Sequence, residues 1–290
     1  MKRACRHLVL LTVLLTAAGP SYGQAVDSLE IISAAWDGDL DTVQRLLDAG
    51  VSPDVRWPDG STALLKASDG GYTDIVKLLL EKKARPDFMD TDGGSALLYA
   101  ADGEHTEIVQ LLLDAEADPN RQGRDSLSAL IRAAENGLPD MVQALLDAGA
   151  DPNLHDIEGG TALLNSLRGG YPGRDYARVA RLLLDAGADP TAHDRAGRTV
   201  LMFAAASGYE DVMRAALEAG AEVNATEDSN GMTALFAASA MGRPDAARLL
   251  LEAGADVTVK DKQGKTALAH AMEGNHAAVV AVLKEAGAQE

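Results

Sequence analysis

Two features of this sequence contain residue types that could do chemistry. The first is "GKT" at 264–266, which matches the end of a phosphate-binding loop, although Val259 stands where that loop needs its first glycine. The second is a His-Asp pair that occurs twice, and imidazole and carboxylate groups are common zinc ligands. Whether either feature can act depends on the elements that hold it. The two pairs are His155–Asp156 and His193–Asp194.

The composition narrows the function classes. The chain has 290 residues, of which 47% are hydrophobic and 24% charged, with only three Phe and two Trp. We therefore expect a globular protein whose core is built from Leu, Ala, Val and Ile. A formal net charge of −18 and an isoelectric point near 4.6 argue against binding to nucleic acid, which needs a concentrated basic surface, and against anionic lipid.

The first 25 residues have the features of a secretory signal peptide. A basic start precedes an apolar run over 8–18, and small residues follow at Ser21, Gly23 and Ala25. The run is too short to cross a bilayer, so we predict a signal peptide over 1–23, with cleavage after Ala25 as the alternative. The only cysteine, Cys5, leaves with this segment, and a chain without thiols suits an oxidising compartment. We expect an exported protein, periplasmic or secreted, with no membrane attachment after signal removal.

The remaining sequence repeats itself about every 33 residues. Phrases such as "LLDAGADPN" at 145–153 and "LLLDAGADP" at 182–190 return, and a Thr or Ser recurs with the same neighbours. Such a period is the mark of stacked repeats, each of which buries its apolar face against the next. The recurring residues are Thr62, Ser95, Ser128, Thr161, Thr199, Thr233 and Thr266, at intervals of 33, 33, 33, 38, 34 and 33 residues.

The sequence of each repeat predicts a helix, a turn, a second helix and an extended hairpin. The Thr or Ser is an N-cap, whose side-chain oxygen accepts a hydrogen bond from the first turn of the first helix. A glycine nine residues later, such as Gly71, ends that helix in the left-handed conformation, and another, such as Gly149, ends the second helix. Alanine pairs such as Ala100–Ala101 let first helices of neighbouring repeats lie close together.

The pattern D-x-x-G-x-T-A-L, A-A-x-x-G, I-V-x-L-L-x-x-G-A-D-x-N resembles the ankyrin repeat, in eight copies over about residues 25–290. The resemblance implies an all-α repeat solenoid, an ankyrin stack of helix-turn-helix units joined by short β-hairpin loops. It extends to exported bacterial ankyrin repeat proteins, some of which are tied to envelope stress defence. The predicted repeats are 24–57 (N-terminal cap), 58–90, 91–123, 124–156, 157–194 (with a five-residue insertion), 195–228, 229–261 and 262–290 (C-terminal cap).

The sequence departs from the ankyrin pattern at several positions. The Pro after the Thr is Ala in six repeats, and the His three residues after the Thr is replaced by apolar residues such as Leu65. We therefore expect the polar support that this His gives the loop to be missing. Lys83, Glu104 and Glu116 stand where the pattern has turn glycines, so we expect strain or looseness in repeats two and three.

The repeats leave little room for chemistry. Thr266 of "GKT" already has a capping role. The two His-Asp pairs fall in neighbouring repeats, on the order of 8–10 Å apart, whereas zinc ligands lie about 2 Å from one ion. The repeat geometry also assembles no Ser, His and acid set for nucleophilic catalysis. We predict no enzyme activity, no catalytic or metal-binding residues and no cofactor.

A variable face of the first helices is the predicted contact surface. Positions four, seven and eight after each cap share one helical face and vary far more than the Leu and Ala between them, so they are not core. We predict that a protein partner lies along this concave face and the adjacent hairpin tips. The predicted contacts are Trp36, Asp37, Lys66, Asp69, Tyr99, Asp102, Arg132, Glu135, Arg168, Phe203 and Met241 on this face, with Asn165 and His270 at equivalent positions, and Arg56, Trp57, Arg195 and Arg198 at the tips.

The favoured function is a non-catalytic protein–protein interaction module, acting as a monomer. The alternative is a secreted effector or inhibitor that binds and blocks an enzyme or toxin. An enzyme whose site the sequence does not reveal is a third class, and native mass spectrometry would detect its bound small molecule or metal.

Signal removal gives the first testable prediction. The mature chain should begin at Gln24, or at Val26 if cleavage follows Ala25. The intact mass of the periplasmic or secreted protein measures this directly. A soluble chain that retains Met1 would contradict the prediction.

Overall fold

The computed structural model describes residues 22–169 and 173–289. The predicted signal peptide, apart from its last two residues, lies outside the described residues, and so does part of the repeat-five insertion. The chain divides into two compact units, Met1–Arg124 and Asp125–Glu290. None of the described helices is long and apolar enough to cross a membrane.

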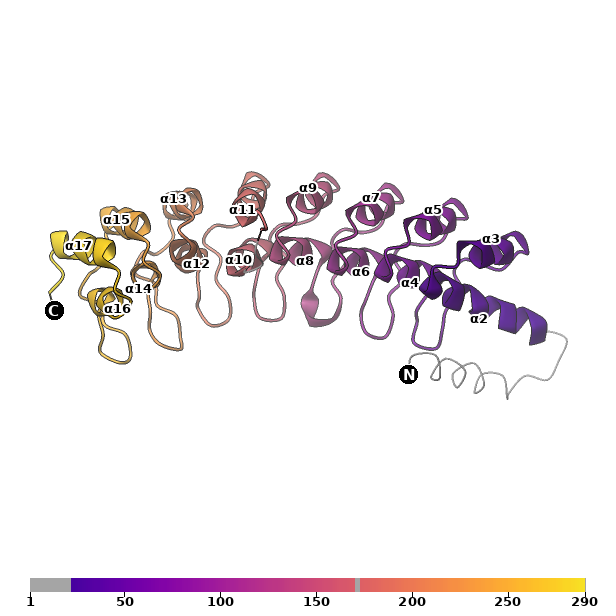
Figure 1. The fold of residues 1–290 in the computed structure, drawn as a ribbon, viewed down its shortest axis with the longest axis horizontal. Coiled ribbons are helices and arrows are strands. Elements are labelled where there is room, and N and C mark those ends of the chain that lie inside the picture. The colour runs from indigo at the N-terminus through magenta and orange to yellow at the C-terminus, as the bar shows by residue number, and fades with distance from the viewer. Residues whose placement is uncertain (1–21, 170–172, 290) are drawn as a thin grey trace. The chain divides into compact units, whose positions relative to one another are not determined.

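Both units consist of paired helices, as predicted. In each unit the first helices form one layer, the second helices form another, and the hairpins project from the first-helix layer (Figure 1). The first unit contains α2 (Tyr22–Asp37), α3 (Leu40–Asp48), α4 (Ala63–Asp69), α5 (Thr73–Glu81), α6 (Ala96–Asp102) and α7 (Thr106–Asp114). The second contains α8 (Ala129–Glu135), α9 (Pro139–Asp147), α10 (Ala162–Arg168), α11 (Tyr176–Asp185), α12 (Val200–Ser207), α13 (Glu210–Glu218), α14 (Ala234–Ala240), α15 (Pro244–Glu252), α16 (Ala267–Glu273) and α17 (Ala277–Glu285).

The predicted N-caps are confirmed in six of the seven repeats that carry them. Each side-chain oxygen accepts a hydrogen bond of 3.1–3.3 Å from the amide three residues later, which satisfies one of the free amides at the helix start. Thr233 precedes α14 without this bond. The six capping residues are Thr62, Ser95, Ser128, Thr161, Thr199 and Thr266.

The turns after the helices are left-handed where glycine predicts it, as at Gly71 and Gly149. The same conformation is imposed on three side chains that favour it poorly: φ is 67° at Lys83, 60° at Glu104 and 61° at Glu116. A Cβ in this region clashes with the following carbonyl, so these positions carry the strain that the sequence suggests.

The core lies between neighbouring repeats. Ala100 and Ala101 of α6 and Ala133 and Ala134 of α8 are 0% exposed, so these small residues are fully buried in the packed stack. Larger residues fill the space between the two layers, among them Leu112 of α7. A helix pair alone would leave these surfaces in water, and removal of a buried Leu costs about 2–5 kcal/mol.

The hairpins contain less β-structure than predicted. Where strand pairing occurs it consists of isolated antiparallel bridges, because the arms between turn and cap are too short for a ladder. The bridges join Met89 to Ser95, His155 to Thr161 and His193 to Thr199. The hairpin before α8 contains the 3₁₀ turn η1 (Arg124–Ser126) instead, with left-handed Asp125 and Ser126.

Strain at Glu116 can be tested by substitution. We expect Glu116→Gly to raise the free energy of unfolding by about 0.5–1 kcal/mol, because glycine tolerates a positive φ. Gln110→Gly, within α7, should lower it by about 1 kcal/mol, because glycine disfavours a helix interior. Urea unfolding followed by circular dichroism measures both, and a fall of equal size in both variants would contradict the strain.

Candidate functional site

Carboxylates, most of them buried, hold five of the hairpins, including the one that carries the predicted tip residues Arg195 and Arg198. Asp194, five residues before the cap of α12, accepts hydrogen bonds at Oδ1 from the amides of Ala196 and Arg198, at 2.9 and 3.0 Å. Sequence reasoning did not assign this role, although the recurring D-x-x-G-x-T contains the residue. The equivalent carboxylates are Asp90, Asp156 and Asp261, each with two such amides at 2.8–3.0 Å, and Glu227, which accepts amides at both oxygens.

The second oxygen of three of these carboxylates is bonded to position four of the following helix. Asp90 Oδ2 lies 2.7 Å from the Tyr99 hydroxyl, Asp156 Oδ2 lies 2.9 Å from Asn165 Nδ2, and Asp261 Oδ2 lies 2.7 Å from His270 Nε2. The loop therefore has a polar support, supplied by this pair in place of the missing His. The apolar residues at the family's His position leave that particular support out, but first-helix side chains reach these three hairpins and supply another.

These bonds change the interpretation of position four. Asn165 is only 6% exposed, so the prediction that this face lies wholly outside the core is wrong there. Tyr99 is half-buried, and desolvation together with its hydrogen bond to Asp90 raises the pKa of its hydroxyl. Tyr99 thus fixes its hairpin and offers only part of its ring to solvent.

Three predicted residues of the first unit meet in one cluster, which we call the tryptophan cluster: Trp36, Trp57 and Lys66. The ring centroids of Trp36, near the end of α2, and Trp57, in the next hairpin, are 5.8 Å apart with planes tilted by 51°. The ammonium group of Lys66, on α4, lies 4.9 Å from the Trp36 ring centroid. Trp36 is nevertheless 47% exposed.

Arg56 supports its hairpin and is not a free tip. Its guanidinium donates hydrogen bonds to the carbonyls of Gly60, at 3.3 Å, and Met89, at 3.2 Å, and lies 5.0 Å from the ring centroid of Phe88. Arg85 lies 4.8 Å from the same centroid. The sequence did not single out Phe88 or Arg85. The predicted carboxylates Asp37, Asp69 and Asp102 are exposed at the ends of α2, α4 and α6.

In the second unit, predicted residues form an arginine cluster: Arg168, Arg198 and Phe203, around Asp194. Arg168 Nη2 and Arg198 Nε both donate to Asp194 Oδ2, the latter at 2.7 Å. The two guanidinium carbons lie 5.1 and 5.5 Å from the Phe203 ring centroid. Asp194 is 2% exposed; burial acts to raise its pKa, but hydrogen bonds and charge from Arg198 outweigh burial and hold the pKa below its usual value.

The other predicted residues of this unit lie apart from that cluster. Arg132 pairs with Glu135 one turn later on α8, at 2.7 Å. Arg195 is exposed at the hairpin tip, and Met241, at the end of α14, is 58% exposed.

Comparison with known families agrees with this geometry. A family model described as "Ankyrin repeats (3 copies)" matches residues 31–123, 130–227, 172–261 and 226–290. The chain belongs to the ankyrin repeat family. Ankyrin repeats are protein–protein interaction modules and are typically not catalytic. A search of curated proteins finds no match.

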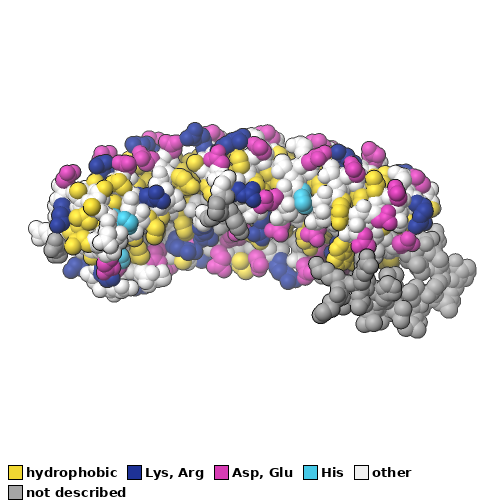
Figure 2. Space-filling model, in the orientation of Figure 1, with side chains coloured by type: hydrophobic (Ala, Val, Ile, Leu, Met, Phe, Trp, Pro, Cys, Tyr) yellow, Lys and Arg dark blue, Asp and Glu magenta, His cyan; other side chains and the backbone are white. Residues whose placement is uncertain are grey.

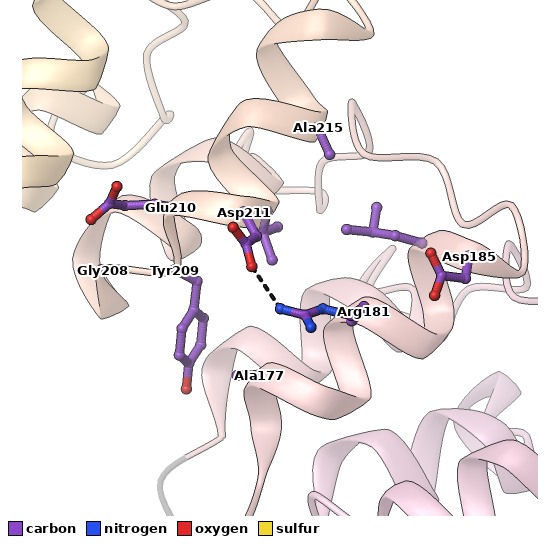
Figure 3. A pocket seen from close by; sticks show the side chains of 10 residues that line it. Ala177, Arg181, Asp185, Gly208, Tyr209, Glu210, Asp211 and Ala215 are labelled. Carbon is purple, nitrogen blue, oxygen red and sulfur yellow. Dashed lines mark hydrogen bonds and ion pairs between the residues drawn. The ribbon is translucent and has the colours of Figure 1, made fainter.

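The second-helix layer of these ankyrin repeats carries mainly mixed charges (Figure 2). It also contains a groove of about 650 Å³ between α11 and α13. Arg181 reaches across the groove to Asp211, at 2.7 Å, and Tyr209 lines the same space (Figure 3). No sequence pattern predicted this groove, which is formed by helices from different repeats.

The two His-Asp pairs do not form a metal site. Asp156 and Asp194 turn inward to hold their own hairpins, whereas His155 and His193 are exposed. Across the described part of the chain, no group of three or more His, Cys, Asp or Glu side chains could hold a metal ion.

The hairpin carboxylates predict a pH dependence. Burial acts to raise the pKa of Glu227, but hydrogen bonds from Ser229, Asn230 and Met232 outweigh it and lower the pKa from 4.5 to about 2. A depressed pKa stabilises the fold above about pH 4.5, and this contribution disappears as the pH falls towards 2. Glu227→Gln should therefore lower the free energy of unfolding at about pH 6 and have a diminishing effect towards pH 2.

Urea unfolding at several pH values measures the difference between the two proteins. Glu218→Gln, at the exposed end of α13, is the matched control and should change the free energy of unfolding by less than about 0.5 kcal/mol throughout. An effect of Glu227→Gln that is independent of pH would show that its charge has no part in holding the hairpin.

Proposed function

We propose that the mature chain is an exported, non-catalytic ankyrin repeat protein that binds a protein partner through its first-helix face and hairpin tips. The proposal includes a periplasmic or secreted location, supported by the basic start and short apolar run of residues 1–25. A role in envelope stress defence rests only on the resemblance to exported bacterial ankyrin proteins. Removal of the signal would separate the binding surface from the export segment.

The observation that carries the binding proposal is the tryptophan cluster. A soluble domain normally buries most of a Trp side chain, whereas Trp36 is 47% exposed beside Trp57. Lys66 lies over the Trp36 ring. The exposed Asp37 follows Trp36 directly and the exposed Asp69 is one turn after Lys66 on α4, so the apolar surface has a polar rim. Aromatic side chains within such a rim are typical binding hot spots.

The location of the cluster also suits binding. Its three residues come from α2, the following hairpin and α4, so ordinary packing of the stack fixes their relative positions. A surface that is already ordered loses little conformational entropy when a partner binds. The cluster can therefore contribute affinity without rearrangement.

Substitution of Trp36 tests the proposal. A partner is first isolated from the exporting compartment with the mature chain as bait, and its affinity for each variant is then measured by titration. Trp36→Ala should weaken binding by about 2 kcal/mol or more, because it removes the exposed anchor. Asp74→Ala, at an exposed position on α5, should cost less than about 0.5 kcal/mol.

Both variants should retain the wild-type circular dichroism spectrum, since neither side chain is buried. Equal affinities for Trp36→Ala and Asp74→Ala would show that the tryptophan cluster is not the binding surface.

A further inference from the structure

At position four, the hairpin before α12 differs from the three hairpins in which a helix side chain is bonded to the carboxylate. There the equivalent of Tyr99, Asn165 and His270 is Phe203, whose side chain has no hydrogen-bond donor. Asp194 Oδ2 is instead bonded by two guanidinium groups, from Arg168 and Arg198. One buried carboxylate thus neutralises only one of two adjacent cations.

The second cation faces solvent. Arg198 uses Nε to reach Asp194, and its side chain is 46% exposed. Its two terminal nitrogens have no hydrogen-bond partner among the described residues. A guanidinium has five N–H donors in a planar fork, so most of the donors of Arg198 are available to a ligand.

Arg195 adds a third cation at the same hairpin. Its backbone amide donates to the carbonyl of Glu158 at 2.9 Å, which ties the tip to the neighbouring hairpin. Its side chain is exposed and makes no ion pair within the part of the chain that the structure describes. The Phe203 ring lies against the guanidinium of Arg198 and limits the directions in which the fork can point.

We infer that Arg198 and Arg195, supported by Arg168, Asp194 and Phe203, bind carboxylate side chains of a short acidic segment. This inference rests on the proposed function, since the segment belongs to the protein partner. A carboxylate fits the guanidinium fork with two parallel hydrogen bonds, and such charge-assisted bonds are stronger than neutral ones.

The charge of the whole chain limits the length of that segment. With a formal net charge of −18, the protein repels extended polyanions such as nucleic acid. Charges are screened beyond about 8 Å at physiological ionic strength. A few carboxylates held against the arginine cluster therefore gain local attraction and experience little of the long-range repulsion.

A peptide titration tests this inference without knowledge of the partner. The probe is a fluorescein-labelled octapeptide with four Glu among Gly and Leu, added to the full mature chain at low salt. A peptide with Gln in place of each Glu is its control. We expect saturable binding of the Glu peptide, at least tenfold tighter than that of the Gln peptide, and at least fivefold weaker binding to Arg198→Gln.

Arg214→Gln is the matched control variant, because it removes the same charge from an exposed residue of α13. It should weaken Glu-peptide binding less than twofold. If Arg198→Gln unfolds the hairpin, Arg195→Gln replaces it, with an expected loss of at least threefold. Similar losses for Arg198→Gln and Arg214→Gln, no preference for Glu over Gln, or equal affinity for a short thymidine oligonucleotide would each overturn the inference.

Trp36→Ala separates this inference from the proposed function. It should leave Glu-peptide binding unchanged, because Trp36 belongs to the other unit. Suppose that Glu-peptide binding depends on Arg198 and that Trp36→Ala leaves the affinity for the partner unchanged. The acidic-segment site would then stand, and the tryptophan cluster would not be the main anchor. If Trp36→Ala weakens partner binding but Glu-peptide binding does not depend on Arg198, the acidic-segment site is disproved and the proposed function stands.

Discussion

Burial between neighbouring repeats is the constraint on which the rest of the structure depends. A single helix pair cannot remove its apolar face from water, so each first helix presents Ala, as at Ala100 and Ala133, where it meets a neighbour. The exposed ion pairs between second helices, such as Lys77–Glu107 at 2.8 Å, contribute at most about 1 kcal/mol each. Apolar burial therefore holds the stack, and variable side chains are tolerated only on the faces that it leaves free.

The hairpins depend on a second, smaller set of hydrogen bonds. In five hairpins a carboxylate accepts hydrogen bonds from the turn amides, and in three of these a side chain at position four of the next helix, such as Tyr99, is bonded to the same carboxylate. Both candidate binding clusters occur in hairpins where this pair of interactions is incomplete, as it also is in the hairpins before α8 and α14. Trp57 replaces the carboxylate in one hairpin, and Phe203 replaces the donor in another. In both places a side chain that would have fixed the loop is replaced by one that leaves aromatic or cationic surface accessible.

The arginine side chains serve two different purposes, since some hold the fold and others are accessible to a ligand. Several arginines hold the fold, as Arg56 does through carbonyls of two hairpins. Few cations therefore remain for a ligand on a chain with a formal net charge of −18. The terminal nitrogens of Arg198 are among them, and the deep burial of Asp194 beneath them keeps that carboxylate from competing with an incoming one.

The sequence by itself determined the features that depend on neighbours along the chain. The 33-residue period, the N-caps such as Thr62 and the left-handed turns follow from hydrogen bonds that span three or four residues, so local residue types were enough to predict them. The tertiary structure alone decided which of the variable residues are exposed and free to contact a partner. Asn165 is buried by its bond to Asp156, and Arg168 reaches Asp194 across 26 positions of the chain. Contacts of that kind depend on how one repeat packs on the next, and no local pattern in the sequence encodes the direction of each side chain.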